Sequence, residues 1–366
     1  KLNATQINNL KASESSGVLF SGNIVLDGNL SGNAAQVLAQ FQDYRILEAK
    51  NFTASSTTAS ISGTSAVADI ASIVSAGATN TNLTYSLSDT TDNLNTAVTS
   101  NNAVLVNATD IGFSETIDND AKLTKLNSVA GVGSASVSGT VSSTPTLIAS
   151  RTNLGSGDNL TITLTDDASL SQFATIKGYT SQSTIAFSNS KGLSDALSDF
   201  ISSEQKTQDY VTAKAGTVDV PITLSAITTS VSNLKDLNAL LSDNEGGVTA
   251  TLNPANNNAD ALSAITATDN GSALNLTAGS GNSLTVNVGT QATDDTKISR
   301  LNTLIGQAGV SSVTGSLTSV TVTQATTITS GQSKVAVGLA LDSTAPSVSE
   351  GAVIAGRTTG TVTFGS

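Results

Sequence analysis

Internal repetition constrains the fold of this chain more than any other feature of its sequence. Residues 120–129 (DAKLTKLNSV) align with residues 295–304 (DTKISRLNTL), so that apolar residues match apolar residues and basic residues match basic residues. Partial copies run through Leu234–Leu241 and through Ile7 and Leu10. In each copy the apolar residues recur at i, i+3 and i+6 or i+7, which predicts one stripe on a short amphipathic helix. A recurring helix of this kind indicates that one small unit is built several times.

Alternating sequence follows each predicted helix. Residues 135–140 (ASVSGT) are nearly identical to residues 59–64 (ASISGT) and resemble residues 311–316 (SSVTGS). Apolar side chains alternate there with Ser, Thr or Asn, which is the period-2 pattern of half-buried strands. We expect further strands of this kind at residues 160–164, 273–276, 284–288 and 320–322.

A Thr-Asp pair recurs where strands are expected to end or helices to begin, at residues 109–110, 165–166, 268–269 and 293–294. Asp is a preferred N-cap, because its carboxylate accepts from free N–H groups and its charge suits the helix dipole. Other short helices are expected to begin near residues 33, 65, 91, 169, 192 and 258.

The repeating unit is therefore a strand, a turn, a short helix and another strand, and one copy has too little apolar area to fold alone. We expect a β-rich fold with short helices, an irregular α/β or β-solenoid of stacked repeats. The alternative is a row of small β-sandwich domains. The predicted organisation is an N-terminal repeat array at 1–143, middle repeats with an irregular insertion at 144–230, and a C-terminal array ending in strands at 231–366.

Composition excludes most familiar enzyme chemistry. The 366 residues include no His, Cys, Met or Trp, so Ser-His-Asp and Cys-His centres, zinc fingers and disulfides are impossible. The formal net charge is -12 and the Lys and Arg residues are scattered singly, which argues against nucleic-acid binding. No stretch approaches the roughly 20 apolar residues of a membrane span. A large, acidic chain rich in Ser and Thr and free of Cys is typical of bacterial surface proteins.

Calcium is the most plausible ligand, because this hard cation binds carboxylates and carbonyls in Asp, Asn and Gly turns. The candidate ligands lie in short acidic clusters: Asp89, Asp92, Asp118, Asp120, Asp166, Asp167, Asp269, Asp294 and Asp295. None of these clusters matches an EF-hand loop. The competing interpretation, that most of these residues cap helices and form turns, fits the majority of them better.

Catalytic motifs are weak, and we expect that the chain is not an enzyme. Residues 188–191 and 203–206 fit S-x-x-K and residues 242–244 read SDN, but no K-T-G follows and the richness in Ser produces such matches by chance. A polysaccharide-active enzyme would need paired acids and, as a rule, aromatic platforms for sugar rings. The four tyrosines are isolated, so packing or surface placement explains them better.

Both ends of the sequence look like the interior of a repeat. Ile7 and Leu10 occupy a helix stripe, and residues 360–364 (GTVTF) read as a strand. An uncapped array exposes edge strands and an apolar cross-section. We therefore expect either that the sequence is an excerpt from a longer array or that copies stack end to end.

The Leu-x-x-Leu-Asn helices, Ser-x-Ser-Gly-Thr strands and Thr-Asp turns resemble the repeat regions of large secreted surface proteins of cyanobacteria and other marine bacteria. That group covers S-layer-like proteins, adhesins and extracellular filaments. The resemblance spans nearly the whole chain and implies a scaffolding role with homotypic assembly.

From these observations we expect an extracellular structural protein of the cell surface that assembles with copies of itself into a layer or filament. The expected mechanism is stacking of repeats and pairing of terminal strands. The alternative is an adhesin or a phage tail-fibre segment that binds cell-surface glycans, and a polysaccharide-active enzyme is a distant third. The expected partners are further copies, without nucleic acid and without a membrane span.

Overall fold

A computed structural model describes most of the chain in two compact units. It describes residues 9, 24–26, 30–39, 52–54, 59–75, 83–179, 185–188, 191–202, 221–243, 246–254, 262, 268–269, 272–273, 276, 278–279, 281–330 and 334–364. Unit 1 comprises residues 1–165 and 175–186, and unit 2 comprises residues 166–174 and 187–366. The division passes through α8 (Leu170–Lys177). The three-part division drawn from the sequence remains a prediction about how the repeats group.

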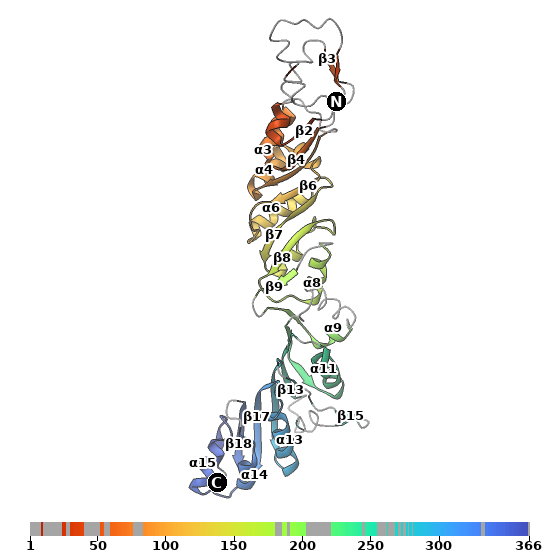
Figure 1. Cartoon of the computed structure of the whole chain (residues 1–366). Helices are drawn as coiled ribbons and strands as arrows, with labels where there is room; N and C mark the ends of the chain where they lie inside the picture. The colour runs from red at the N-terminus through yellow and green to blue at the C-terminus, as the bar shows by residue number, and fades with distance from the viewer. Residues whose placement is uncertain are drawn as a thin grey trace. The chain divides into compact units, whose positions relative to one another are not determined.

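Unit 1 is built around a seven-stranded sheet whose strands follow one another in chain order (Figure 1). The strands are β2 (Leu30–Gly32), β4 (Ala59–Ser65), β5 (Leu83–Asp89), β6 (Asp110–Phe113), β7 (Ser136–Ser143), β8 (Asn159–Leu164) and β9 (Ile185–Phe187). The connections contain α3 (Val67–Ser75), α4 (Thr91–Ser100), α5 (Asn102–Val106), α6 (Asp120–Ala130) and α7 (Pro145–Ala149). A separate parallel pair joins β1 (Ile24–Leu26) to β3 (Phe52–Ala54).

Unit 2 repeats this plan with an eight-stranded sheet, in which seven strands follow one another in chain order and the eighth, β12, pairs with β13 beside them. Its strands are β10 (Leu193–Asp195), β11 (Ile222–Leu224), β12 (Ile227–Thr229), β13 (Val248–Pro254), β16 (Ser283–Ala292), β17 (Val310–Val320), β18 (Val335–Leu341) and β19 (Val362–Thr363). Its helices are α9 (Leu197–Ser202), α11 (Val231–Asp243), α13 (Asp295–Ile305), α14 (Val322–Thr327) and α15 (Val348–Ala355). A short antiparallel pair is formed by β14 (Thr268–Asp269) and β15 (Ser272–Ala273).

The predicted fold class is wrong, both as a β-rich fold with short helices (an irregular α/β or β-solenoid of stacked repeats) and in its alternative, a row of small β-sandwiches. Both large sheets are open and parallel, and helices alternate with strands along the chain. A parallel neighbour cannot be reached through a hairpin, so the chain must cross back over the sheet, usually through a helix. The recurring short helices are therefore the crossovers of an alternating α/β fold and not minor inserts between strands.

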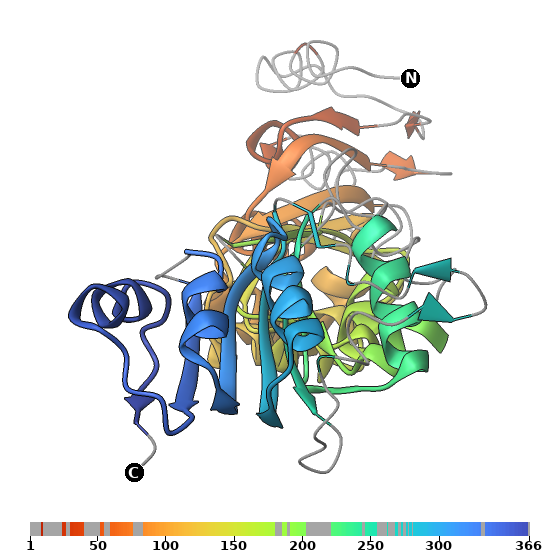
Figure 2. The same cartoon turned by 90° about the horizontal axis from the view of Figure 1, so that it is seen from below.

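The helices of each unit cover one face of its sheet. In unit 1, α3 contacts α4, α4 contacts α6, and α6 contacts α7. In unit 2, α13 contacts α14 and α14 contacts α15. Figure 2 shows the blue helices of unit 2 in such a row. Crossovers between parallel strands are right-handed as a rule, so crossovers that advance in one direction place every helix on the same face.

The strands bury their apolar residues beneath these helices and expose hydroxyl groups on the other face. In β8 the side chains of Leu160, Ile162 and Leu164 are buried, whereas Thr161 is exposed and Thr163 is half-buried. The same alternation runs through β5, β7 and β16. All-parallel sheets are ordinarily covered on both faces. Here the open face is tolerated because short polar side chains replace the usual apolar ones.

The repeated helices form as the sequence predicts. Helix α6 buries Leu123, Leu126 and Val129, and α13 buries Ile298, Leu301, Leu304 and Ile305. The strand predicted at residues 320–322 is wrong, because α14 begins at Val322. Thr321 and Gln324 form a capping box there, which ends the strand and starts the helix. The helix copy at Ile7 and Leu10 and the helix expected near residue 258 lie outside the described residues.

Candidate functional site

Acidic residues at or just after strand ends bind the start of a helix in the preceding repeat. Asp89 Oδ2 accepts from Val67 N at 3.1 Å, across 22 residues. The equivalent bonds join Glu115 Oε1 to Thr91 N at 2.9 Å and Asp195 Oδ2 to Leu170 N at 3.2 Å. Each carboxylate satisfies a first-turn N–H group and places negative charge at the positive end of the helix dipole. These bonds tie each strand end to the start of a helix earlier in the chain.

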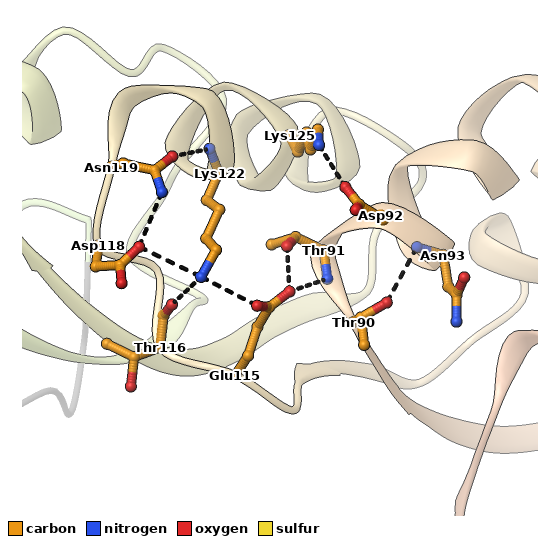
Figure 3. A network of polar contacts seen from close by, with 10 residues as sticks. All are labelled: Thr90, Thr91, Asp92, Asn93, Glu115, Thr116, Asp118, Asn119, Lys122 and Lys125. Carbon is orange, nitrogen blue, oxygen red and sulfur yellow. Dashed lines mark hydrogen bonds and ion pairs between the residues drawn. The ribbon is translucent and has the colours of Figure 1, made fainter.

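Glu115 is the centre of the most extensive of these contacts (Figure 3). Its carboxylate also accepts from the Thr91 hydroxyl, and its Oε2 lies 3.0 Å from Lys122 Nζ. Lys122 Nζ in turn lies 3.3 Å from Asp118 Oδ1 and donates to the Thr116 carbonyl at 3.0 Å. The hydrogen bonds from Thr91, followed by that from Lys122, lower the pKa of Glu115 to about 2. The bond to Glu115 raises the pKa of Lys122.

The structure places the predicted calcium ligands of unit 1 in contacts with the chain itself. Asp89 accepts from Val67 N, Thr90 N and Asn93 Nδ2; Asp92 pairs with Lys125, Asp118 with Lys122, and Asp120 with Arg151. Two of these pairs join neighbouring repeats: Asp92 of α4 pairs with Lys125 of α6, and Asp120 of α6 pairs with Arg151, which follows α7. Asp89 therefore caps a helix, Asp92 and Asp120 bridge repeats, and Asp118 forms a local pair four residues from its lysine.

The remaining candidates lie in unit 2 and have similar roles. Asp166 lies 2.7 Å from Lys191 Nζ, and this hydrogen bond lowers the pKa of the Asp166 carboxyl. Asp167 accepts from Gly192 N, Asp294 caps α13 by accepting from Lys297 N, and Asp295 accepts from Gln324 Nε2. Asp269 lies in β14. The capping role predicted from the Thr-Asp pair is confirmed at Asp294.

No group of three acidic side chains in the described part of the chain is arranged to hold a metal ion. The calcium prediction remains a prediction. The sequence reasoning missed Glu115 and Asp195, although one signal was present. An acidic residue ends or follows several strands about one repeat after a helix start, and the sequence predicts such a start near Thr91.

The Leu-Asn pair of the repeated helix has a bridging function. Asn127 Oδ1 accepts from Asn153 N at 2.9 Å, and Asn153 Nδ2 donates to the Asn127 carbonyl at 2.9 Å. At the equivalent position of unit 2, Asn302 Oδ1 accepts from Thr329 N at 2.7 Å. Each Asn therefore holds the segment that follows the next helix. In this motif the Leu side chain is buried, and the Asn side chain hydrogen-bonds to the next repeat.

The C-terminal edge of the unit 2 sheet is open among the described strands. Strand β19 pairs with β18 through Val362 and Thr363 and forms the end of the strand order. Helix α15 contacts α14 on one side. Its Val348 and Val353 are 94% and 42% exposed, and Phe364 after β19 is 61% exposed. These are three of the four large hydrophobic residues exposed in the described structure.

No known protein family, curated protein or solved structure matches the chain. The resemblance to bacterial surface-protein repeats therefore remains a prediction from the sequence. The helices in the described ranges include none with the length and apolar character needed to cross a membrane.

Proposed function

We propose that this chain is a structural protein of the cell surface that assembles with further copies of itself into an extracellular layer or filament. The observation that carries the proposal is the open edge formed by β19, α15 and Phe364. The extracellular location rests on the acidic, Ser- and Thr-rich, Cys-free composition and on the resemblance to secreted repeat proteins.

The partner that fits this edge is a strand–helix unit of a second copy. Inside unit 2, α14 packs against α13 and α15 packs against α14, while β17, β18 and β19 pair in parallel. The outer side of α15 is the surface that a following helix would cover if the pattern continued. Covering an exposed Val side chain contributes about 1.5–3 kcal/mol. A parallel strand beside β19 would add main-chain hydrogen bonds in the same step.

A charge placed on the exposed side of α15 tests the apolar contribution. Val348→Asp adds one negative charge to a side chain that is 94% exposed, so the isolated fold tolerates it. We expect sedimentation velocity to show loss of the larger species and electron micrographs to show loss of the ordered polymer. Val106→Asp is the matched control, because it adds the same charge to a 43% exposed valine of unit 1. Equal effects of both substitutions would contradict the proposed edge.

A proline at the edge strand tests the main-chain contribution. Leu339 N donates to Thr361 O at 2.9 Å, so the main chain of Val362, one residue further, points away from β18. Val362→Pro therefore removes an outward N–H group and leaves the bonds to β18 intact. We expect weaker association with an unchanged Tm, whereas Val362→Ala keeps the donor and associates normally. A wild-type chain that stays monomeric and binds glycans saturably would instead support an adhesin.

A further inference from the structure

Two buried polar atoms in unit 2 have no partner in the described chain. Gln291 lies in β16 and its side chain is completely buried, at 0% exposure. Its Oε1 atom and the Oγ1 atom of Thr293 are both shielded from solvent, and neither has a hydrogen-bond partner among the described residues. A buried polar atom without a partner is costly, and native proteins contain few of them. Two such atoms two residues apart point to one shared ligand.

The repeat shows that nothing in the fold requires a polar residue at this position. Gln291 pairs with Leu317 of β17, as Ile117 pairs with Val141 and Ala168 with Leu193 in other repeats. Ile117 and Ala168 are also 0% exposed. In these two described repeats an apolar side chain fills the equivalent position, where this repeat has a glutamine.

The two unpartnered atoms belong to side chains on the same side of the sheet. Thr293 N donates to Thr318 O at 2.9 Å, so the strand pairing and its alternation continue past Gln291. Residues i and i+2 of a strand project from the same face. Gln291 Nε2 donates to the Val288 carbonyl at 2.6 Å, which fixes the orientation of the amide. The Oε1 atom is then left as a pure acceptor, while the Thr293 hydroxyl can donate or accept.

We propose that Gln291 and Thr293 bind one buried water molecule. Water can donate to Gln291 Oε1 and exchange a second hydrogen bond with Thr293 Oγ1, as buried waters do at otherwise unsatisfied polar groups. The local charge favours a neutral ligand over a cation. Lys297 Nζ donates to the carbonyl of Ala292, between the two residues, at 2.7 Å. An ammonium at this place repels a metal ion, and the carboxylate of Asp294 already accepts from Lys297 N.

A stability comparison and a crystal structure test this site. Thr293→Val leaves the water with one partner, so we expect Tm to fall by about 2–4 °C, the shift typical of one lost hydrogen bond in a unit of this size. The double substitution Gln291→Ile with Thr293→Val copies the apolar repeat and should recover at least the wild-type Tm. Thr290→Val is the matched control on the exposed side of the same strand, and Tm should not change.

Electron density in a high-resolution crystal structure of the wild-type chain identifies the ligand. A single peak within hydrogen-bond distance of both Gln291 Oε1 and Thr293 Oγ1, absent from the double variant, supports the proposal. A peak with metal-like coordination distances, or a direct Gln291–Thr293 hydrogen bond with nothing between them, would overturn it. Additive loss of Tm in the double variant would overturn it as well, because the two side chains would then act separately.

Discussion

Glu115 links a strand end, a helix start and a lysine through one carboxylate. Its pKa is lowered from 4.5 to about 2 by the bonds from Thr91 and Lys122. The ionised form is therefore favoured in the folded chain more than in the unfolded chain. That preference stabilises the fold fully above about pH 4.5 and disappears as the pH falls through about 2, where the carboxyl is protonated in both states.

Replacing this carboxylate should remove part of the acid sensitivity of the protein. We expect Glu115→Gln to lower the urea midpoint at neutral pH, because the amide cannot provide the charged bonds to Thr91 and Lys122. Between about pH 4.5 and about pH 2 the variant should lose less stability than wild type, since it lacks a group that titrates in this window. Parallel slopes of the two urea midpoints against pH would show that Glu115 does not contribute.

Local roles of single residues were predictable, and roles across repeats were not. Asp294 caps α13 by accepting from Lys297 N, which is only three residues further along the chain. Local sequence spacing is therefore sufficient to predict this cap. Asp89 and Asp195 instead reach helix starts that lie 22 and 25 residues earlier. Residues so far apart in the sequence come close in space only after two strands pair in register. Local sequence patterns contain no information about that register.

Among the elements, the glycine of the repeated Ser-Gly or Thr-Gly strand segment is a backbone requirement. Gly63 has φ +78 and Gly315 has φ +123, and residues other than glycine rarely adopt such positive φ values. The two sites differ in their surroundings. A Cβ atom at Gly63 would meet nothing within 4 Å, whereas one at Gly315 would lie 2.6 Å from the Gly289 carbonyl oxygen. Strands β16 and β17 approach each other closely at this point.

Alanine at these two glycines should separate backbone strain from steric conflict. We expect Gly63→Ala to cost about 1–2 kcal/mol in unfolding free energy, the ordinary penalty for the left-handed region. Gly315→Ala should cost clearly more, because the β16–β17 contact must also open. Urea denaturation of both variants measures the difference. Equal losses would show that β17 moves freely away from Gly289.

The elements were predicted better than their arrangement. Helix and strand periods gave α6, α13 and β8 nearly at their observed bounds. The relation between strands was missed, because an alternating strand looks the same in a parallel and in an antiparallel sheet. The face covered by helices and the open face rich in hydroxyls differ only in which alternate residues point inward. A two-layer α/β arrangement and a β-rich coil therefore share one sequence pattern.

For the whole molecule, the net charge of -12 opposes the association proposed for the open edge. Copies repel one another over a Debye length of about 30 Å at 0.01 M salt, which falls to about 8 Å at 0.15 M. The contact that we propose uses exposed apolar side chains such as Val348 and Phe364, and screening does not weaken a contact of this kind. Salt should therefore favour assembly.

We expect sedimentation velocity to show larger species as NaCl rises from about 0.01 M to about 0.15 M. CaCl₂ at equal ionic strength should act to the same extent if screening alone is responsible. A greater effect of CaCl₂ would indicate specific binding by the acidic residues, and dissociation on adding NaCl would contradict an apolar interface.

The chain-order arrangement of both sheets also determines how the protein can fold. Contacts between neighbouring repeats bridge separations such as 21 residues at Val137 and Asp158 and 34 residues at Val248 and Asn282. The loops to be closed are short relative to a chain of 366 residues, so the entropy cost of each is small. No strand of a large sheet waits for a partner from the far end of the chain. Folding can therefore advance strand by strand from the N-terminal side while later repeats are still being synthesised.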